Sequence, residues 1–156
     1  MTRVRPRLVR YAAAGWGVGE LWLVGEQPVW HELPRGTDAD GELAHPLVER
    51  LARYFRGDPL SFGDVDLGVE WETPFQERVA AALREIPWGE TVTYGELAAL
   101  AGHPNAQRAV GTFCARNAVP LFVPCHRVVA AAGVGPYGSL GVEYKKRLLA
   151  LEGHAL

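Results

Sequence analysis

The chain has 156 residues, with 16 lysine and arginine against 18 aspartate and glutamate side chains, a formal net charge of −2 at pH 7. Apolar residues make up 48% of it and charged residues 22%, as in ordinary globular domains, which excludes intrinsic disorder and a polycationic tail. Two cysteines are too few for a disulfide scaffold, and no apolar run approaches the roughly 18 residues of a membrane span. The length fits one or two domains.

Charge is unevenly distributed along the chain. Up to residue 72, 12 acidic side chains outnumber 8 basic ones, whereas from residue 73 onward 8 basic side chains outnumber 6 acidic ones. The segment 103–147 carries six cations and one anion, so it could face phosphates, although a solvated positive surface explains such a cluster equally well. The arginine-rich first ten residues precede no apolar run with a cleavage site, so we expect no signal peptide and a cytoplasmic location.

The first third of the chain predicts a sheet. Short apolar segments at 8–11, 16–24 and 29–33 are separated by glycine and Gln-Pro turns, a pattern typical of an antiparallel meander. Within the second segment one parity is apolar: Trp16, Val18, Trp22 and Val24.

A helix covering this sheet is predicted over 45–55. Its apolar residues recur on one helical face: Leu47, Val48, Leu51, Tyr54 and Phe55. The run 56–72 has many glycine, proline and aspartate residues and little periodicity, which indicates a connecting segment. We therefore predict two domains, 1–72 and 73–156.

The second domain opens with a helix start. Thr73 is an N-cap, Pro74 occupies the first helical position, and Gln76 is placed to return the capping hydrogen bond. A core stripe follows at Phe75, Val79, Leu83 and Ile86.

Two short helices are predicted next. Thr93 and Glu96 form a capping box, Gly102 can end the first helix, and Asn105 is placed as N-cap of the second. This outline is that of a helix-turn-helix, although helical hairpins with glycine turns are also common in ordinary cores. Arg108, at about the third position of the second helix, opposes the helix dipole, a conflict that a nearby phosphate would remove. The neighbouring residues are mostly small and would allow close approach to a groove.

The most informative stretch surrounds Cys125. It lies between Pro124 and His126, with Arg127 beyond, where positive charge can favour the reactive thiolate. Inert packing is the alternative, because buried cysteines are usually unreactive.

Residues 124–128, Pro-Cys-His-Arg-Val, resemble the active-site signature of the O6-alkylguanine-DNA alkyltransferases, also called methylated-DNA–protein-cysteine methyltransferases. The similarity covers roughly half of the chain, with the family's landmarks in order: Thr73, 91–98, 108–111, Asn117 and 148–153. It implies an α/β (α+β) fold, with an N-terminal ribonuclease-H-like antiparallel sheet with helix and a C-terminal helical domain containing a winged helix-turn-helix.

The resemblance also implies catalytic roles. Cys125 would displace guanine from the alkyl carbon on its O6 and keep the alkyl group, so that each molecule acts once in DNA repair; O4-alkylthymine is a second candidate substrate. His126, through a water, would take the thiol proton and be oriented by Glu152. Tyr94 would donate to N3 of the leaving guanine.

For DNA, the resemblance implies that a monomer binds double-stranded DNA containing O6-alkylguanine through the minor groove. Arg108 would fill the gap left by the extruded nucleotide. The other DNA-binding candidates surround it on the same helix: Asn105, Ala106, Gln107, Ala109 and Gly111.

The substrate pocket is implied on the same basis. Asn117 would hinge the recognition helix to the active-site strand, and backbone groups of Cys125 and Val128 would read the exocyclic amine. Tyr137 and Ser139 lie in the loop 133–141, whose spacing to the next helix is shifted relative to the family. Cys114 stands where relatives often carry a larger residue, and we interpret it as pocket wall rather than a second nucleophile.

Neither a metal nor a cofactor is expected. His31 and His45 have no cysteine nearby, and no phosphate-cradling loop or dinucleotide fingerprint is present. Two alternatives to alkyl transfer remain: a non-catalytic alkyltransferase-like protein that binds lesions, and a cysteine hydrolase or thiol redox protein. Relatives of the first kind lack the cysteine, and the second would need a Cys-x-x-Cys or an oxyanion loop, which the chain does not offer.

Overall fold

The structure is a computed structural model that describes residues 5–36 and 45–154; part of the arginine-rich start therefore lies outside the described residues. The chain forms two compact units. The first extends to Leu60 and includes Asp64–Val69 and Ala118–Pro120; the second comprises Ser61–Gly63, Glu70–Asn117 and the chain from Leu121 onward. That residues 1–72 and 73–156 are separate domains stays a prediction. Among the described helices, none has the length and apolar character needed to cross a bilayer.

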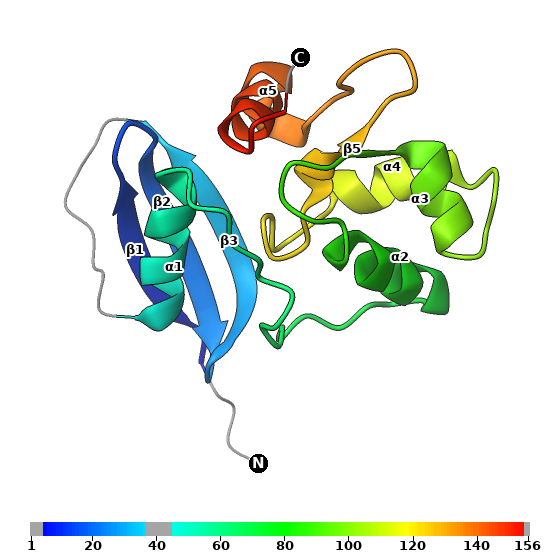
Figure 1. The fold of residues 1–156 in the computed structure, drawn as a ribbon. Coiled ribbons are helices and arrows are strands. Elements are labelled where there is room, and N and C mark those ends of the chain that lie inside the picture. Colours follow the sequence, from blue (N-terminus) through cyan, green and yellow to red (C-terminus); the bar gives the residue numbers. More distant parts are fainter. Residues whose placement is uncertain (1–4, 37–44, 155–156) are drawn as a thin grey trace. The chain divides into compact units, whose positions relative to one another are not determined.

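The first unit contains the predicted antiparallel meander, in the order β1-β2-β3. The strands β1 (Arg7–Ala13) and β3 (Gln27–Arg35) are longer than predicted, whereas β2 (Gly17–Val24) begins one residue later than predicted. Helix α1 (Pro46–Phe55) lies on one face of this sheet, as predicted (Figure 1). It begins where the His45 side chain accepts a hydrogen bond from the amide of Leu47, at 3.1 Å.

Strand β2 buries the parity opposite to that of Val18, Trp22 and Val24. Leu21 and Leu23 are fully buried, whereas Trp22 and Val24 are half-buried. Gly19 lies on the buried face, where a Cβ would lie 2.4 Å from a ring carbon of Tyr11. The inner face of β2 is therefore small where the large Tyr11 ring packs, a cross-strand fit that alternation alone does not reveal.

The second unit begins with α2 (Pro74–Arg84). Thr73 caps it as predicted, its Oγ1 accepting from the amide of Gln76 at 3.1 Å. The predicted return bond is wrong in its donor, since Gln76 Oε1 accepts from the amide of Glu72, at 2.9 Å. Val79 and Leu83 form the buried stripe, with Phe75 and Ile86 only half-buried at its ends.

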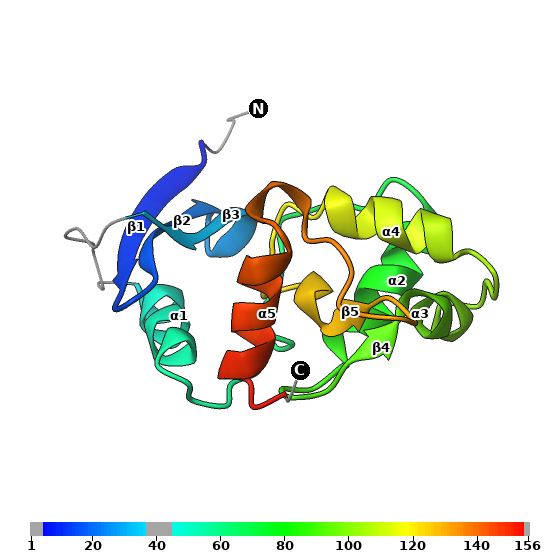
Figure 2. The same ribbon diagram turned by 90° about the horizontal axis from the view of Figure 1, so that it is seen from above.

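Two neighbouring helices follow, α3 (Tyr94–Leu100) and α4 (Gln107–Ala115) (Figure 2). The predicted capping box of α3 is present, with Thr93 and Glu96 bonding reciprocally at 2.9 and 3.1 Å. Asn105 is not the N-cap of α4: its φ of +76° makes it a turn residue, and Ala106 takes the cap position without a side-chain bond. Asparagine tolerates this left-handed conformation better than most residues. Arg108 consequently stands one position earlier in the helix than predicted.

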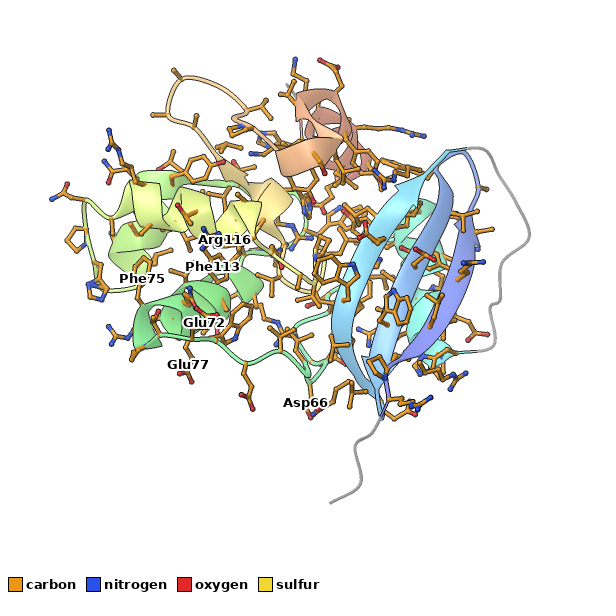
Figure 3. All side chains as sticks on the ribbon, turned by 180° about the vertical axis from the view of Figure 1, so that it is seen from behind. Asp66, Glu72, Phe75, Glu77, Phe113 and Arg116 are labelled. Atoms are coloured by element: carbon orange, nitrogen blue, oxygen red, sulfur yellow. The ribbon has the colours of Figure 1, made fainter. Side chains whose placement is uncertain are left out.

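Helix α4 packs against the segment before α2. Phe113 (labelled in Figure 3) is buried on α4, and its ring packs at a tilt of 40° against that of Trp71, with 5.2 Å between the ring centroids. This contact holds the inner face of α4 in place and leaves its other face exposed.

A short parallel pair joins distant parts of the second unit. Strand β4 (Val92–Thr93) pairs with β5 (Val128–Val129), so the first residue of α3 lies beside the strand that follows Cys125. Two 3-10 turns, η1 (Cys125–Arg127) and η2 (Gly138–Leu140), precede the last helix, α5 (Val142–Leu151).

Candidate active site

Cys125 begins the turn η1 at the end of an apolar segment that is buried from Leu121 to Val128. Its side chain is held by Asn117, which follows α4. Asn117 Nδ2 donates to the carbonyl of Val123 at 2.7 Å and to Sγ of Cys125 at 3.2 Å. One amide thus connects the end of α4 to the segment that carries the thiol.

The surroundings of Cys125 keep its thiol protonated. Burial raises the pKa of Cys125 well above its ordinary value, and a hydrogen bond with Cys114 raises it further, while Asn117 and the charge of Lys145 act in the opposite direction. The expectation that Arg127 favours the thiolate is wrong, because its guanidinium is bound elsewhere. A base is therefore needed before this sulfur can react.

A buried hydrogen-bonded network follows Cys125 in the sequence. His126 Nε2 lies 2.7 Å from Glu152 Oε2. Arg127 forms a two-pronged contact with the same carboxylate, Nε to Oε1 at 2.9 Å and Nη2 to Oε2 at 3.0 Å. The amide of Gly89 donates to Oε1 at 3.2 Å. The helix dipole disfavours an acidic side chain at the C-terminal end of α5, and Arg127 is the cation that offsets this effect at Glu152.

Charge in this network fixes the tautomer of His126. Burial opposes ionisation of Glu152, but its bonds and charge interactions with His126 and Arg127 hold its pKa well below the ordinary value. Burial lowers the pKa of His126, so the ring is neutral near pH 7. Because an ionised carboxylate can only accept, Nε2 carries the proton and Nδ1 is the basic nitrogen.

Two tyrosines, Tyr94 and Tyr137, interact with Cys114 and Cys125. Burial, with the charges of Cys114 and Cys125, raises the pKa of Tyr94 to about 12, so its hydroxyl remains a donor. Burial also raises the pKa of Tyr137 well above its ordinary value, with Cys125 the second cause. A Cβ on Gly135 would lie 3.3 Å from the Tyr94 hydroxyl, so the loop after β5 passes close to this tyrosine.

Lys145 is a neighbour of the site that no sequence motif indicated. This lysine is fully buried on α5, its Nζ 5.6 Å from the centroid of the Tyr94 ring and 3.2 Å from the carbonyl of Pro136, to which it donates. Burial lowers its pKa to about 8. A signal was present, because Lys145 shares a helical face with the apolar Leu148 and Leu149.

The remaining candidates lie apart from this cluster or at its edge. Val128 is buried, and its amide donates to the carbonyl of Cys125; Ser139 is exposed on η2. On α4, Arg108 is exposed and forms no salt bridge with any described residue. A Cβ on Gly111 would meet no atom within 4 Å. The rest of this helix surface is exposed or half-buried: Asn105, Ala106, Gln107 and Ala109.

Comparison with known proteins identifies the family of this chain. Residues 74–154 match the model of the 6-O-methylguanine DNA methyltransferase DNA-binding domain. The chain is 49% identical over 110 residues to the methylated-DNA–protein-cysteine methyltransferase of Methanopyrus kandleri, which covers 70% of this chain and 80% of that relative. The chain belongs to the methylated-DNA–protein-cysteine methyltransferase family. The sequence resemblance is thereby confirmed.

Similarity to this family extends over nearly the whole chain. The methyltransferase of Mycolicibacterium paratuberculosis is 37% identical, with 93% of each chain covered. The crystal structure of the O6-methylguanine methyltransferase of Mycobacterium tuberculosis matches with a TM-score of 0.81 and 32% identity, over 97% of this chain and 96% of that one. A structure of that bacterium's protein in complex with DNA matches with a TM-score of 0.78, 34% identity, and coverage of 95% and 92%. The predicted mixed α/β fold is confirmed by these methyltransferases.

Proposed function

We propose that this protein repairs DNA by transferring an alkyl group from O6 of guanine to Sγ of Cys125, once per molecule. The observation that carries the proposal is the buried Cys125 next in sequence to His126, whose ring is oriented by an ionised carboxylate. Membership of the methyltransferase family supports the reaction type. The non-catalytic alternative is disfavoured because the thiol is present.

Activation of the thiol is the first step. His126 Nδ1 takes the Cys125 proton through one bridging water, and Glu152 stabilises the imidazolium that forms. Arg127 keeps Glu152 ionised, so the carboxylate orients the ring without taking its proton. The thiolate then attacks the alkyl carbon, the bond from that carbon to O6 breaks, and a stable thioether remains on the protein.

Departure of guanine builds negative charge on the base. Tyr94 offsets it by donating its hydroxyl proton in a hydrogen bond to N3, a role for which its raised pKa keeps the phenol protonated. Backbone groups of Cys125 and Val128 read the exocyclic amine, and the Cys125 carbonyl retains one lone pair for this contact. Tyr137, Ser139 and Cys114 complete the pocket.

The exposed face of α4 binds duplex DNA through the minor groove. One protein monomer binds each site. The small side chains on this face allow close approach, and Arg108 enters the space that the extruded nucleotide leaves. Phosphate contacts dominate such binding, so affinity is expected to fall with salt and to vary little with flanking sequence. We further propose a cytoplasmic location, which cell fractionation tests.

Intact-protein mass after incubation with duplex containing O6-methylguanine tests the transfer. We expect each chain to gain one methyl group, located on Cys125, and the reaction to stop at one equivalent because a thioether has no easy hydrolytic exit. Cys125→Ala is expected to retain DNA affinity and lose transfer. An unchanged mass with bound DNA would favour lesion binding, and repeated turnover would favour a hydrolase.

A further inference from the structure

A second thiol lies against the nucleophile. The side chain of Cys114, in the last turn of α4, interacts with that of Cys125. Asn117 contacts both residues: its amide donates to the carbonyl of Cys114 at 3.3 Å, and its Nδ2 donates to Sγ of Cys125 at 3.2 Å. The turn after α4 therefore holds Cys114 and Cys125 on the same asparagine, although the proposed alkyl transfer uses only one of the two thiols.

The two thiols differ in access. Cys125 is 3% exposed, whereas Cys114 is only half-buried. A small oxidant in solvent therefore reaches Cys114 first. The ammonium group of Lys145, buried on α5, interacts with the charged form of both sulfurs.

We propose that Cys114 and Cys125 form an oxidisable dithiol, which a small peroxide converts to an intramolecular disulfide and a thiol reductant restores. In the first step the Cys114 thiolate attacks one peroxide oxygen. An S–O bond forms, the O–O bond breaks, and the leaving hydroxide takes up a proton, which leaves a sulfenic acid on Cys114 and one water.

In the second step the Cys125 sulfur attacks the sulfur of the sulfenic acid. The S–S bond forms, the S–O bond breaks, and the departing hydroxide takes the Cys125 proton to give a second water. Two thiols lose two electrons in total, and hydrogen peroxide is reduced to two waters. No further reactant is required.

The disulfide would have two consequences for the protein. Cys125 has no nucleophilic thiolate while bonded to Cys114, so alkyl transfer stops until the bond is reduced. The same bond protects Cys125 from irreversible oxidation to the sulfinic acid, which would end its single use without repair. The consequence for transfer rests on the proposed function; formation of the bond does not.

Intact-protein mass tests the bond directly. The full-length protein is treated with hydrogen peroxide, denatured, and alkylated with N-ethylmaleimide before and after reduction with dithiothreitol. We expect the oxidised protein to be lighter by two hydrogen atoms and to take up no maleimide, and the reduced protein to take up two. Peptide mapping is expected to show the bond between Cys114 and Cys125 within one chain.

Two variants separate the steps. Cys125→Ser is expected to accumulate a sulfenic acid on Cys114, which dimedone captures. Cys114→Ser is expected to form no disulfide, and its peroxide-treated form, compared with its own reduced form, should lose transfer without recovery by dithiothreitol. Absence of the lighter species in wild-type protein, or reversible inactivation of Cys114→Ser at the wild-type rate, would overturn the proposal. Failure of the reduced wild-type protein to accept a methyl group would instead refute the proposed function.

Discussion

At the scale of single residues, the site separates the nucleophile from its base. Cys125 is buried and its pKa is raised, which suppresses unwanted reactions of the thiol in the free protein. His126 is kept neutral by burial and held at Nε2 by Glu152, so its Nδ1 is ready to accept a proton. Reactivity therefore depends on proton transfer to His126 more than on a preformed thiolate.

This division predicts a pH signature for His126→Asn. Without the base, transfer at pH 7 should slow by a factor on the order of 10² to 10⁴. The remaining reaction needs spontaneous thiolate, so its rate should rise about tenfold per pH unit up to the raised pKa of Cys125. Wild-type protein should vary far less, because the lowered pKa of His126 keeps the base neutral above about pH 6.5.

Single-turnover rates between about pH 6 and pH 10 check this prediction. His45→Asn is a suitable control, because His45 caps α1 in the first unit and asparagine is also a good N-cap. Parallel pH profiles for His126→Asn and the wild type would refute the role assigned to His126.

At the scale of elements, α4 presents its small and cationic residues on one exposed face. Arg108→Ala should slow repair of a fully paired duplex by an amount set by the few kcal/mol of unstacking that the arginine no longer offsets. A mispaired target should be slowed less, and single-stranded substrate least. The measurement is the transfer rate constant at saturating DNA for the three substrates. Equal slowing of all three would reduce Arg108 to a phosphate contact.

Helix α3 begins at Tyr94, the residue proposed to donate to the leaving base. Thr93→Ala removes one bond of the capping box next to Tyr94 and should cost about 1 kcal/mol of stability. The matched change Thr73→Ala, at the cap of α2, should cost a similar amount. Because only Thr93 adjoins Tyr94, transfer should slow in Thr93→Ala and not in Thr73→Ala. Denaturant unfolding and single-turnover rates on both variants decide; equal rates would show that the box does not position Tyr94.

At the scale of the whole molecule, a buried histidine makes stability depend on pH. His31 Nδ1 donates to the carbonyl of Pro120 at 2.7 Å, and the hydroxyl of Tyr11 donates to Nε2 at 2.6 Å. Burial lowers the pKa of His31 to about 4, so the folded protein holds it neutral. The contact fixes residues 118–120, which belong to the first unit although the chain on either side belongs to the second.

The sign of the effect follows from the lowered pKa. Between about pH 4 and pH 6.5 the unfolded chain binds a proton at His31 that the folded chain does not, so stability falls as pH falls. The loss due to His31 should be about 2 kcal/mol between pH 8 and pH 5. Urea unfolding of wild-type protein and His31→Gln at both pH values measures it. An identical pH dependence in the variant would refute the contribution of His31.

Local signals in the sequence determined much of this protein. The meander, α1 and the capping box of α3 follow from alternation, helical periodicity and capping residues, which act over a few positions. Cys125, His126 and Glu152 were predicted as site residues because a contiguous motif and one family landmark carry them.

Only the tertiary structure decided which atoms meet. Arg127 looked like a partner of the thiol by adjacency, yet it pairs with Glu152, because the end of α5 brings a buried carboxylate that needs a cation. Asn105 became a turn residue, Lys145 a buried charge beside the site, and Cys114 a contact of Cys125. Each depends on how distant elements pack and on what burial does to a charge, and neither packing nor burial is set by neighbours in the chain.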